Sequence, residues 1–263
     1  KASLLFFLFC VSVFASPCLC WWNEGHMIVA EVAKKDLLNS EPEAYYLMNN
    51  ITAVLETERH EKIKSFVESA TWPDLVKEYH LHIFDSWHFK DVPVNYSDPS
   101  IPELNKNEEN NALFFMYHVS HSLTHWTKDE IINQDSLFEK SFMLSFMVHI
   151  IGDVHQPLHS CALFNEKYPE GDKGGNFFKV NYTTPDVDNL HKLWDSVFKK
   201  VRSDSPLPLD EASRKLIENY SEDLMKERTR EDLAEDLKKY HYEDYVMESW
   251  ELCKEFVYMN IKE

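Results

Sequence analysis

Two pairs of histidine and aspartate residues with identical spacing are the strongest chemical signal in this sequence. His149 and Asp153 are four residues apart, and so are His191 and Asp195. On an α-helix, residues at this spacing lie on one face, about 40° apart, so each pair can hold a cation between adjacent turns. A single such pair is usually an ordinary hydrogen-bonded pair. Two pairs together favour metal chemistry, and imidazole and carboxylate ligands suit zinc better than calcium or magnesium.

A third candidate ligand follows the first pair. His159 comes ten residues after His149, and a straight helix would place it roughly 80° from that residue. Pro157 must bend or end the helix before His159 is reached. We therefore expect three potential ligands to converge near one helix end.

Helices must position these side chains, because helical patterns greatly outnumber strand patterns. The 263 residues contain no linker-like segment and no repeat, so we expect an all-α fold, a mainly helical single domain over residues 21–263. Amphipathic patterns predict helices near residues 24–38, 58–69, 108–124, 136–155, 188–199, 210–227 and 231–258. Residues 79–107 and 165–185 are predicted to be long loops, and residues 176–182 a short strand or hairpin.

The first twenty residues have the layout of a secretory signal peptide. Lys1 precedes an apolar run that is too short to cross a bilayer, and small residues follow it. No later segment has the apolar length of a membrane helix, so we expect a secreted or lysosome-like location, no stable membrane association, and a monomer. Loss of the signal leaves Cys161 and Cys253, which we predict to pair in an oxidising compartment.

The net charge of the chain and its glycosylation sequons bear on which substrates it can bind and where it is located. The formal net charge is −18, and there is no basic stripe of the kind that binds phosphate backbones. If the substrate carries phosphate, the local positive charge must come from bound metal ions. Glycosylation sequons, which are used only on the surface of an exported chain, occur at Asn50, Asn95, Asn181 and Asn219.

Three further segments place possible ligands beside aromatic residues: WWNEGH at 21–26, ATWPDLVK at 70–77 and WHFKD at 87–91. Together with HIIGDVHQPLH at 149–159 and NLHKLWD at 189–195, they resemble the class I nuclease family. These are the S-one/P-one type secreted, zinc-dependent, single-strand-specific nucleases of fungi and plants. The resemblance spans essentially all of residues 21–263 and implies the fold that these nucleases share with zinc-dependent phospholipase C.

The resemblance implies three zinc ions. The first would be held by Asp74, His88, His149 and Asp153, the second by His159, His191 and Asp195, and the third by Trp21, His26 and Asp153. Asp153 would bridge two ions. Trp21 would contribute its α-amino nitrogen and carbonyl oxygen after cleavage behind Cys20, since an α-amino group readily gives up its proton to a metal.

The resemblance also implies a reaction, which is hydrolysis of single-stranded DNA and RNA to 5′-phosphorylated products, with 3′-nucleotidase activity as a further prospect. Asp91 would orient the attacking water, and Lys77 would stabilise charge on the phosphoryl oxygens. Many relatives have arginine at the position of Lys77, and lysine forfeits the bidentate geometry. Phe89 would stack a nucleobase, and Asn176, in a Gly-Gly-Asn motif, would lie beside the substrate.

Two alternatives stay open at this stage. Zinc-dependent bacterial phospholipase C shares the fold and the N-terminal tryptophan, but its second zinc uses glutamate where this chain has Asp195. A secreted zinc-binding glycoprotein without turnover is the other alternative. His155 is interpreted as support for a ligand. The remaining histidines are interpreted as surface or hydrogen-bonded core residues: His60, His80, His82, His118, His121, His125 and His241.

Overall fold

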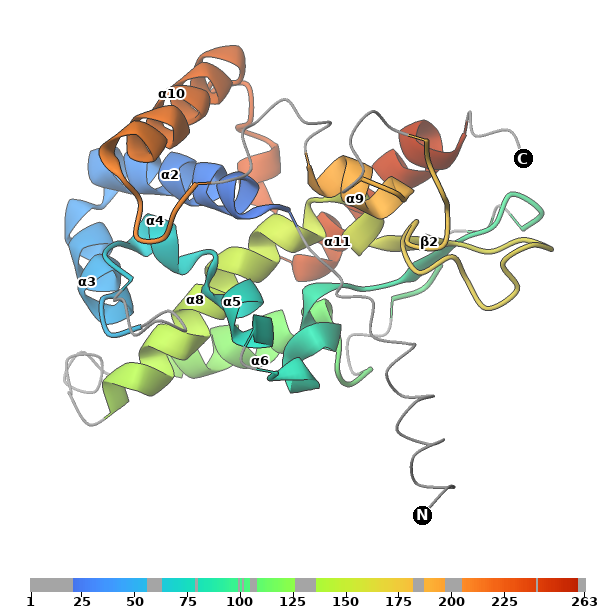
Figure 1. The fold of residues 1–263 in the computed structure, drawn as a ribbon, viewed down its shortest axis with the longest axis horizontal. Helices are drawn as coiled ribbons and strands as arrows, with labels where there is room; N and C mark the ends of the chain where they lie inside the picture. The colour runs from blue at the N-terminus through green and yellow to red at the C-terminus, as the bar shows by residue number, and fades with distance from the viewer. Residues whose placement is uncertain are drawn as a thin grey trace.

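The computed structural model describes residues 21–55, 63–78, 80–98, 100, 102–104, 108–125, 136–181, 187–196, 205–239 and 241–259. The predicted signal peptide, residues 1–20, lies outside these residues. The fold is mainly helical, as predicted, and Figure 1 shows several other helices packed along the long helix α8 (Leu137–Val154). No helix in the described part of the chain is long and apolar enough to cross a membrane.

The elements follow one another in a simple order. The α-helices are α2 (Asn23–Ser40), α3 (Pro42–Thr52), α4 (Phe66–Ser69), α5 (Trp72–Glu78), α6 (Ala112–His125), α8 (Leu137–Val154), α9 (Leu190–Asp195), α10 (Glu211–Glu227) and α11 (Tyr242–Leu252). The 3-10 segments are η1 (His82–His88), η3 (Pro157–His159) and η5 (Asp236–Lys238), and η6 (Cys253–Tyr258) is π-helical. The strands are β1 (Val92–Val94) and β2 (Cys161–Leu163).

Helix α8 is the scaffold of the molecule because it is apolar around most of its circumference, a pattern typical of a buried helix. Phe146, Ile150 and Val154 are completely buried in the main core. The helix contacts α2, α3, α5, α6, α11, η1 and η3. His149 and Asp153 belong to the last turns of the same helix and are therefore buried as well.

A two-stranded parallel sheet joins two segments that carry candidate ligands. Strand β1 pairs with β2 in the register Val92 to Cys161 and Val94 to Leu163. The pairing continues towards the site, where the N–H of Lys90 donates to the carbonyl of His159 over 2.7 Å. The sheet thereby fixes η1 against η3. Strand β1 lies within the predicted 79–107 loop, and neither strand was predicted.

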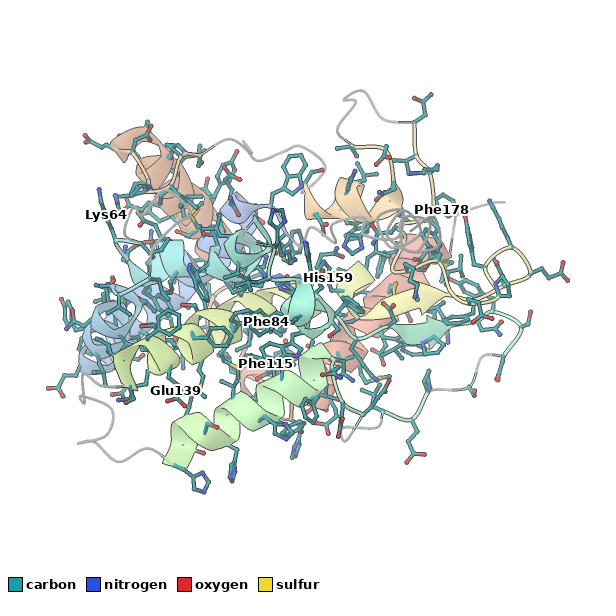
Figure 2. The ribbon with its side chains drawn as sticks, turned by 60° about the horizontal axis from the view of Figure 1, so that its bottom comes forward. Lys64, Phe84, Phe115, Glu139, His159 and Phe178 are labelled. Atoms are coloured by element: carbon teal, nitrogen blue, oxygen red, sulfur yellow. A yellow bond between two sulfur atoms is a disulfide. The ribbon has the colours of Figure 1, made fainter. Side chains whose placement is uncertain are left out.

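A disulfide and a tryptophan attach the C-terminal helices to this sheet. Cys161 and Cys253 are bonded, as predicted, and link β2 to η6. The indole N–H of Trp250 donates to the carbonyl of Pro93 over 2.9 Å. These contacts close the main core on the side of the sheet. Figure 2 shows His159 near the middle of the molecule, with the core residues Phe84 and Phe115 below it in that view.

Several predicted boundaries differ from the structure. Helices α3 and α5 were not predicted, and the predicted helix 231–258 is a turn and η5 followed by α11, which begins only at Tyr242. Of the predicted helix 58–69, residues 66–69 form α4, and residues 58–62 lie outside the described residues. The predicted hairpin at 176–182 is wrong for the described residues, where a single antiparallel bridge joins Lys179 to Asn189.

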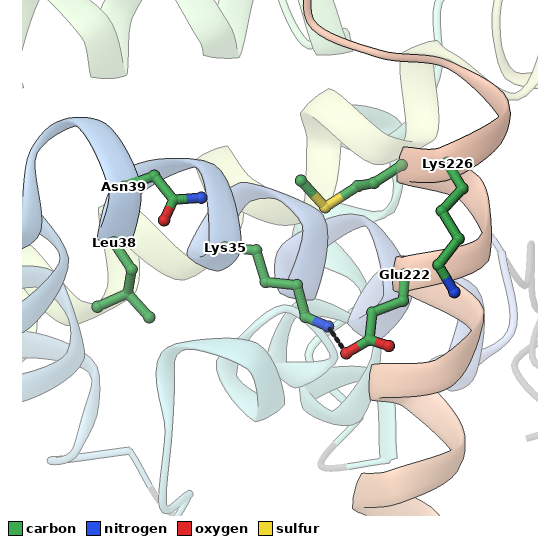
Figure 3. A pocket seen from close by; sticks show the side chains of 6 residues that line it. Lys35, Leu38, Asn39, Glu222 and Lys226 are labelled. Carbon is green, nitrogen blue, oxygen red and sulfur yellow. Dashed lines mark hydrogen bonds and ion pairs between the residues drawn. The ribbon is translucent and has the colours of Figure 1, made fainter.

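A surface hollow of about 420 Å³ lies between α2 and α10. Figure 3 shows its lining, in which Lys35 forms an ion pair with Glu222 over 3.0 Å. The lining residues are Lys35, Leu38, Asn39, Glu222, Met225 and Lys226. None of them is a candidate ligand, so the candidate site has to be built elsewhere.

Candidate metal centre

Side chains from six elements meet at one buried centre. They are His26 of α2, Asp74 of α5, His88 of η1, His149 and Asp153 of α8, His159 of η3, and His191 and Asp195 of α9. All are buried except Asp74, which is partly exposed. These are the eight side-chain ligands predicted from the sequence.

The first cluster is held together by Asp153. Its Oδ2 lies 3.0 Å from Nδ1 of His88 and 3.2 Å from Nε2 of His149, and those two nitrogens are 3.0 Å apart. In a tetrahedral zinc site with bonds of 2.0–2.1 Å, ligand atoms lie about 3.3 Å from one another. Oδ1 of Asp74 is 3.8 Å and 3.7 Å from the same two nitrogens. The cluster therefore has the size and the donor set of a zinc site.

The second cluster has similar dimensions. Nε2 of His191 lies 3.3 Å from Oδ2 of Asp195, one helical turn away on α9. Nε2 of His159 lies 3.5 Å from Oδ1 of the same carboxylate. Three donors of these residues fall within 4.8 Å of one another. His159 thus lies beside the second His/Asp pair, which is the grouping that the family resemblance implies, whereas the spacing alone had placed His159 with the first pair.

The other oxygen of Asp153 faces a different histidine. Its Oδ1 lies 3.3 Å from Nε2 of His26, whose ring stacks on that of His149 with 3.7 Å between centroids. Trp21 is close by, because its indole N–H donates to the carbonyl of Gly152 over 2.9 Å. Asp153 is therefore placed to bridge two metal sites.

Backbone carbonyls orient three of the imidazoles. The N–H at Nδ1 of His149 donates to the carbonyl of Ala70 over 2.6 Å. The N–H at Nδ1 of His159 donates to the carbonyl of His88 over 2.8 Å. In the same way His191 donates to Gly174 over 2.7 Å. In the neutral ring, each bond keeps the proton on Nδ1 and leaves Nε2, which is turned to the centre, able to bind a cation. A hydrogen bond of this kind behind the ring is typical of metal-binding histidines.

Several polar atoms at the centre lack a hydrogen-bond partner within the described part of the chain. They are Nε2 of His26, Oδ1 of Asp153, Nε2 of His159 and Oδ2 of Asp195. A buried polar atom left without a partner costs roughly 1–3 kcal/mol. Native proteins rarely leave such atoms together without a ligand. Their convergence on two carboxylates fits bound cations.

The electrostatics of the centre are strongly perturbed. Burial, with a smaller contribution from Lys77, lowers the pKa of His88 to about 3. Burial opposes ionisation of Asp153, but the facing imidazoles of His149 and His159 hold its pKa well below the usual range. Burial also opposes protonation of His159, but Asp153 raises its pKa to about 9. The centre thus keeps a carboxylate that needs a positive partner.

The predicted catalytic residues Asp91 and Lys77 interact with residues of this centre. Burial raises the pKa of Asp91 to about 6, although Lys173 and His191 oppose that shift. Lys77 donates to Oδ1 of Asp74 over 2.7 Å, so it contacts a candidate ligand directly. Phe89, next to the buried His88, is partly exposed.

The Gly-Gly-Asn loop lies against the second cluster. Gly174 has a φ of 58°, and a Cβ there would lie 2.2 Å from the carbonyl oxygen of Leu158. Only glycine allows this close approach, and the approach brings the carbonyl of Gly174 to the ring of His191. The side chain of Asn176 donates to the carbonyl of Lys173 over 2.9 Å and is half-buried. The motif thus supports a ligand as well as shaping a turn.

Sequence reasoning missed Gln156. Its amide N–H donates to Oδ1 of Asp195 over 2.6 Å, and its amide oxygen accepts from the N–H of Leu158. The supporting role assigned to His155 was wrong, because His155 is exposed and bonds to the carbonyl of Ile151. A polar residue before Pro157 at a helix start is a capping signal that could have indicated Gln156.

Comparisons with known proteins agree with this arrangement. The model of the S1/P1 Nuclease family matches residues 21–263. Endonuclease 4 of Arabidopsis thaliana is 27% identical over 219 residues, and Endonuclease 3 of the same plant is 26% identical over 216 residues. Each alignment covers 78% of this chain and 66% of the relative, so the chain spans just under two thirds of their length. Nuclease S1 of Aspergillus oryzae is 45% identical over 53 residues, which are 20% of this chain and 15% of that protein.

Proposed function

Because this chain belongs to the S1/P1 nuclease family, we propose that it is a zinc-dependent nuclease. Its substrates would be single-stranded DNA and RNA, cut to 5′-phosphorylated products, and mononucleotides with a 3′-phosphate. The observation that carries the proposal is the carboxylate of Asp153, whose two oxygens face different histidines at 3.3 Å and 3.2 Å.

Three zinc ions fit the donors that the chain offers. Asp74, His88, His149 and Asp153 would hold the first, His159, His191 and Asp195 the second, and Trp21, His26 and Asp153 the third. Three Zn²⁺ ions against three ligand carboxylates leave about three positive charges at the centre. That local charge explains how a protein of net charge −18 attracts a phosphodiester.

Bound zinc supplies Lewis acidity, which acidifies water and stabilises negative charge on phosphate oxygens. The residues of the chain position the reactants around it. Asp91, with its pKa raised to about 6 by burial, can accept a hydrogen bond or a proton from the attacking water near neutral pH. Lys77 stabilises charge on the phosphoryl oxygens and holds Asp74 in place.

Substrate binding is proposed to rest on stacking. The partly exposed Phe89 directly follows the proposed ligand His88, so a base stacked on its ring would bring the attached phosphate to the centre. Stacking on an aromatic ring is worth roughly 1–3 kcal/mol and depends little on the base. A paired base cannot stack in this way, which favours single strands. Asn176 is the other residue proposed to contact the substrate, because its Gly-Gly-Asn loop lies against the ligand His191.

Export is the remaining part of the proposal. Removal of residues 1–20 would leave Trp21 as the N-terminal residue, with its α-amino group available to the third ion. The disulfide between Cys161 and Cys253 suits an oxidising compartment. The sequon residues Asn50, Asn181 and Asn219 are exposed. All of these features support a secreted or lysosome-like location.

The family match favours a nuclease over a phospholipase or a zinc-binding glycoprotein without turnover. Parallel assays on single-stranded DNA, duplex DNA and phosphatidylcholine test this choice. We expect acid-soluble nucleotides from the single strand, little from the duplex, and none after chelation of zinc. Hydrolysis of the lipid alone, or no chelator-sensitive hydrolysis at all, would reject the proposal.

A further inference from the structure

Helix α6 presents a row of exposed histidines away from the metal centre. His118, His121 and His125 all lie on its solvent side. The opposite side, with Phe115, is buried in the main core. The sequence interpretation treated these histidines as unrelated surface residues, and for His121 and His125 it overlooked their spacing of four residues.

The rings of His121 and His125 lie close together. Their centroids are 4.0 Å apart and the planes are tilted by 42°. The N–H at Nδ1 of His125 donates to the backbone carbonyl of His121 over 2.6 Å. The carbonyl fixes the tautomer, so Nε2 of His125 carries a lone pair. This is the backbone support that metal-binding histidines generally have.

Two histidines four residues apart on one helix face are a known arrangement for binding a divalent cation. We propose that His121 and His125 form a surface site for a transition-metal ion that prefers imidazole, with zinc, nickel and copper as the suitable class. Water would fill the other coordination positions, because both side chains are exposed. The ion should therefore exchange more readily than one in the buried centre.

The neighbouring His118 provides a matched control. Its Nδ1 also donates to a backbone carbonyl, that of Phe114, over 2.8 Å, and its ring stacks on the Phe114 ring at 3.9 Å. The residue four positions later is Ser122, not a histidine. His118 thus shares the exposure and the tautomer of His125, but its ring packs against Phe114 instead of against a second imidazole.

The site does not depend on the proposed nuclease activity, since it is made from exposed side chains on another helix. It does bear on any zinc count, because one exchangeable surface ion would add to those in the buried centre.

The test is equilibrium dialysis of the full, natively folded protein against increasing free zinc at pH 7.5, with bound zinc measured by elemental analysis. We expect His121→Ala and His125→Ala each to bind one ion fewer per chain than the wild type at high free zinc. His118→Ala should match the wild type. The difference between variants isolates the surface ion whatever the occupancy of the buried centre.

Equal zinc binding by the wild type and both variants at pH 7.5 overturns the proposal, as does an equal loss in His118→Ala. Circular dichroism of each variant checks that α6 remains folded. We expect no change, because the substituted side chains are exposed.

Discussion

The imidazole rings of His26 and His149 lie almost parallel, 16° apart, yet their Nε2 atoms face different oxygens of one carboxylate. Nε2 of His26 lies 3.3 Å from Oδ1 of Asp153, and Nε2 of His149 lies 3.2 Å from Oδ2. Two stacked imidazoles could not both be protonated at low cost, since their like charges would repel. Two cations bridged by a carboxylate satisfy this geometry.

Replacing Asp153 by asparagine should remove metal from two sites at once. The amide keeps the shape of the side chain but loses its charge and one acceptor oxygen. Loss of a residue that only supports a metal ligand typically lowers metal affinity or activity by about 10–100-fold. Because Asp153 is proposed to bind metal itself, we expect a loss of activity of at least about a hundredfold. Zinc content and hydrolysis of single-stranded DNA measure the effect. Asp223→Asn, on the exposed side of α10, is the control, and full zinc content in Asp153→Asn would contradict the bridging role.

Gln156→Leu should weaken the second metal site. It removes the 2.6 Å hydrogen bond to Asp195 and leaves the N–H of Leu158 without its acceptor. We expect zinc to bind about 10–100-fold more weakly at this site and the protein to lose roughly 1–3 kcal/mol of stability. Chelator competition and urea unfolding measure the two effects. His155→Ala, one residue earlier but exposed, should change neither, and equal effects of the two substitutions would refute the assignment.

Gly152→Ala tests the close approach of α2 to α8. A Cβ at Gly152 would lie 3.1 Å from Nδ1 of His26. Alanine favours a helix over glycine by about 1 kcal/mol, so α8 should stay intact while His26 is displaced. We expect loss of the ion assigned to His26 with the others retained. In a His26→Ala background the same substitution should have no further effect on zinc content, and an additive loss there would argue against this coupling.

The pH dependence of hydrolysis should report Asp91. Burial raises its pKa to about 6, and only the carboxylate can accept a proton from water. The rate should therefore fall as the pH drops through about 6. Bound cations nearby stabilise the carboxylate, so they would shift this fall to a somewhat lower pH. Asp91→Asn should lower kcat by about 10²–10⁴ and remove this acid limb. An unchanged limb in the variant would assign it to another group.

The sequence predicted best what depends on helical periodicity. The pairs on α8 and α9 have the geometry that their spacing implies, and the disulfide was predicted from the two cysteines outside the predicted signal peptide. The sequence alone could not show that the backbone of Lys90 pairs with His159, because the register of a parallel pair between distant segments depends on tertiary packing. Gln156 was missed for a similar reason, since its partner Asp195 lies on another helix.

A zinc count on the protein beginning at Trp21 tests the central claim most directly. It should be made on the His125→Ala variant, which excludes the surface ion, together with an assay on single-stranded DNA. We predict three tightly bound zinc ions per chain and hydrolysis that stops when a chelator removes them. A single bound ion, or none, in a fully active preparation would contradict the three-zinc account.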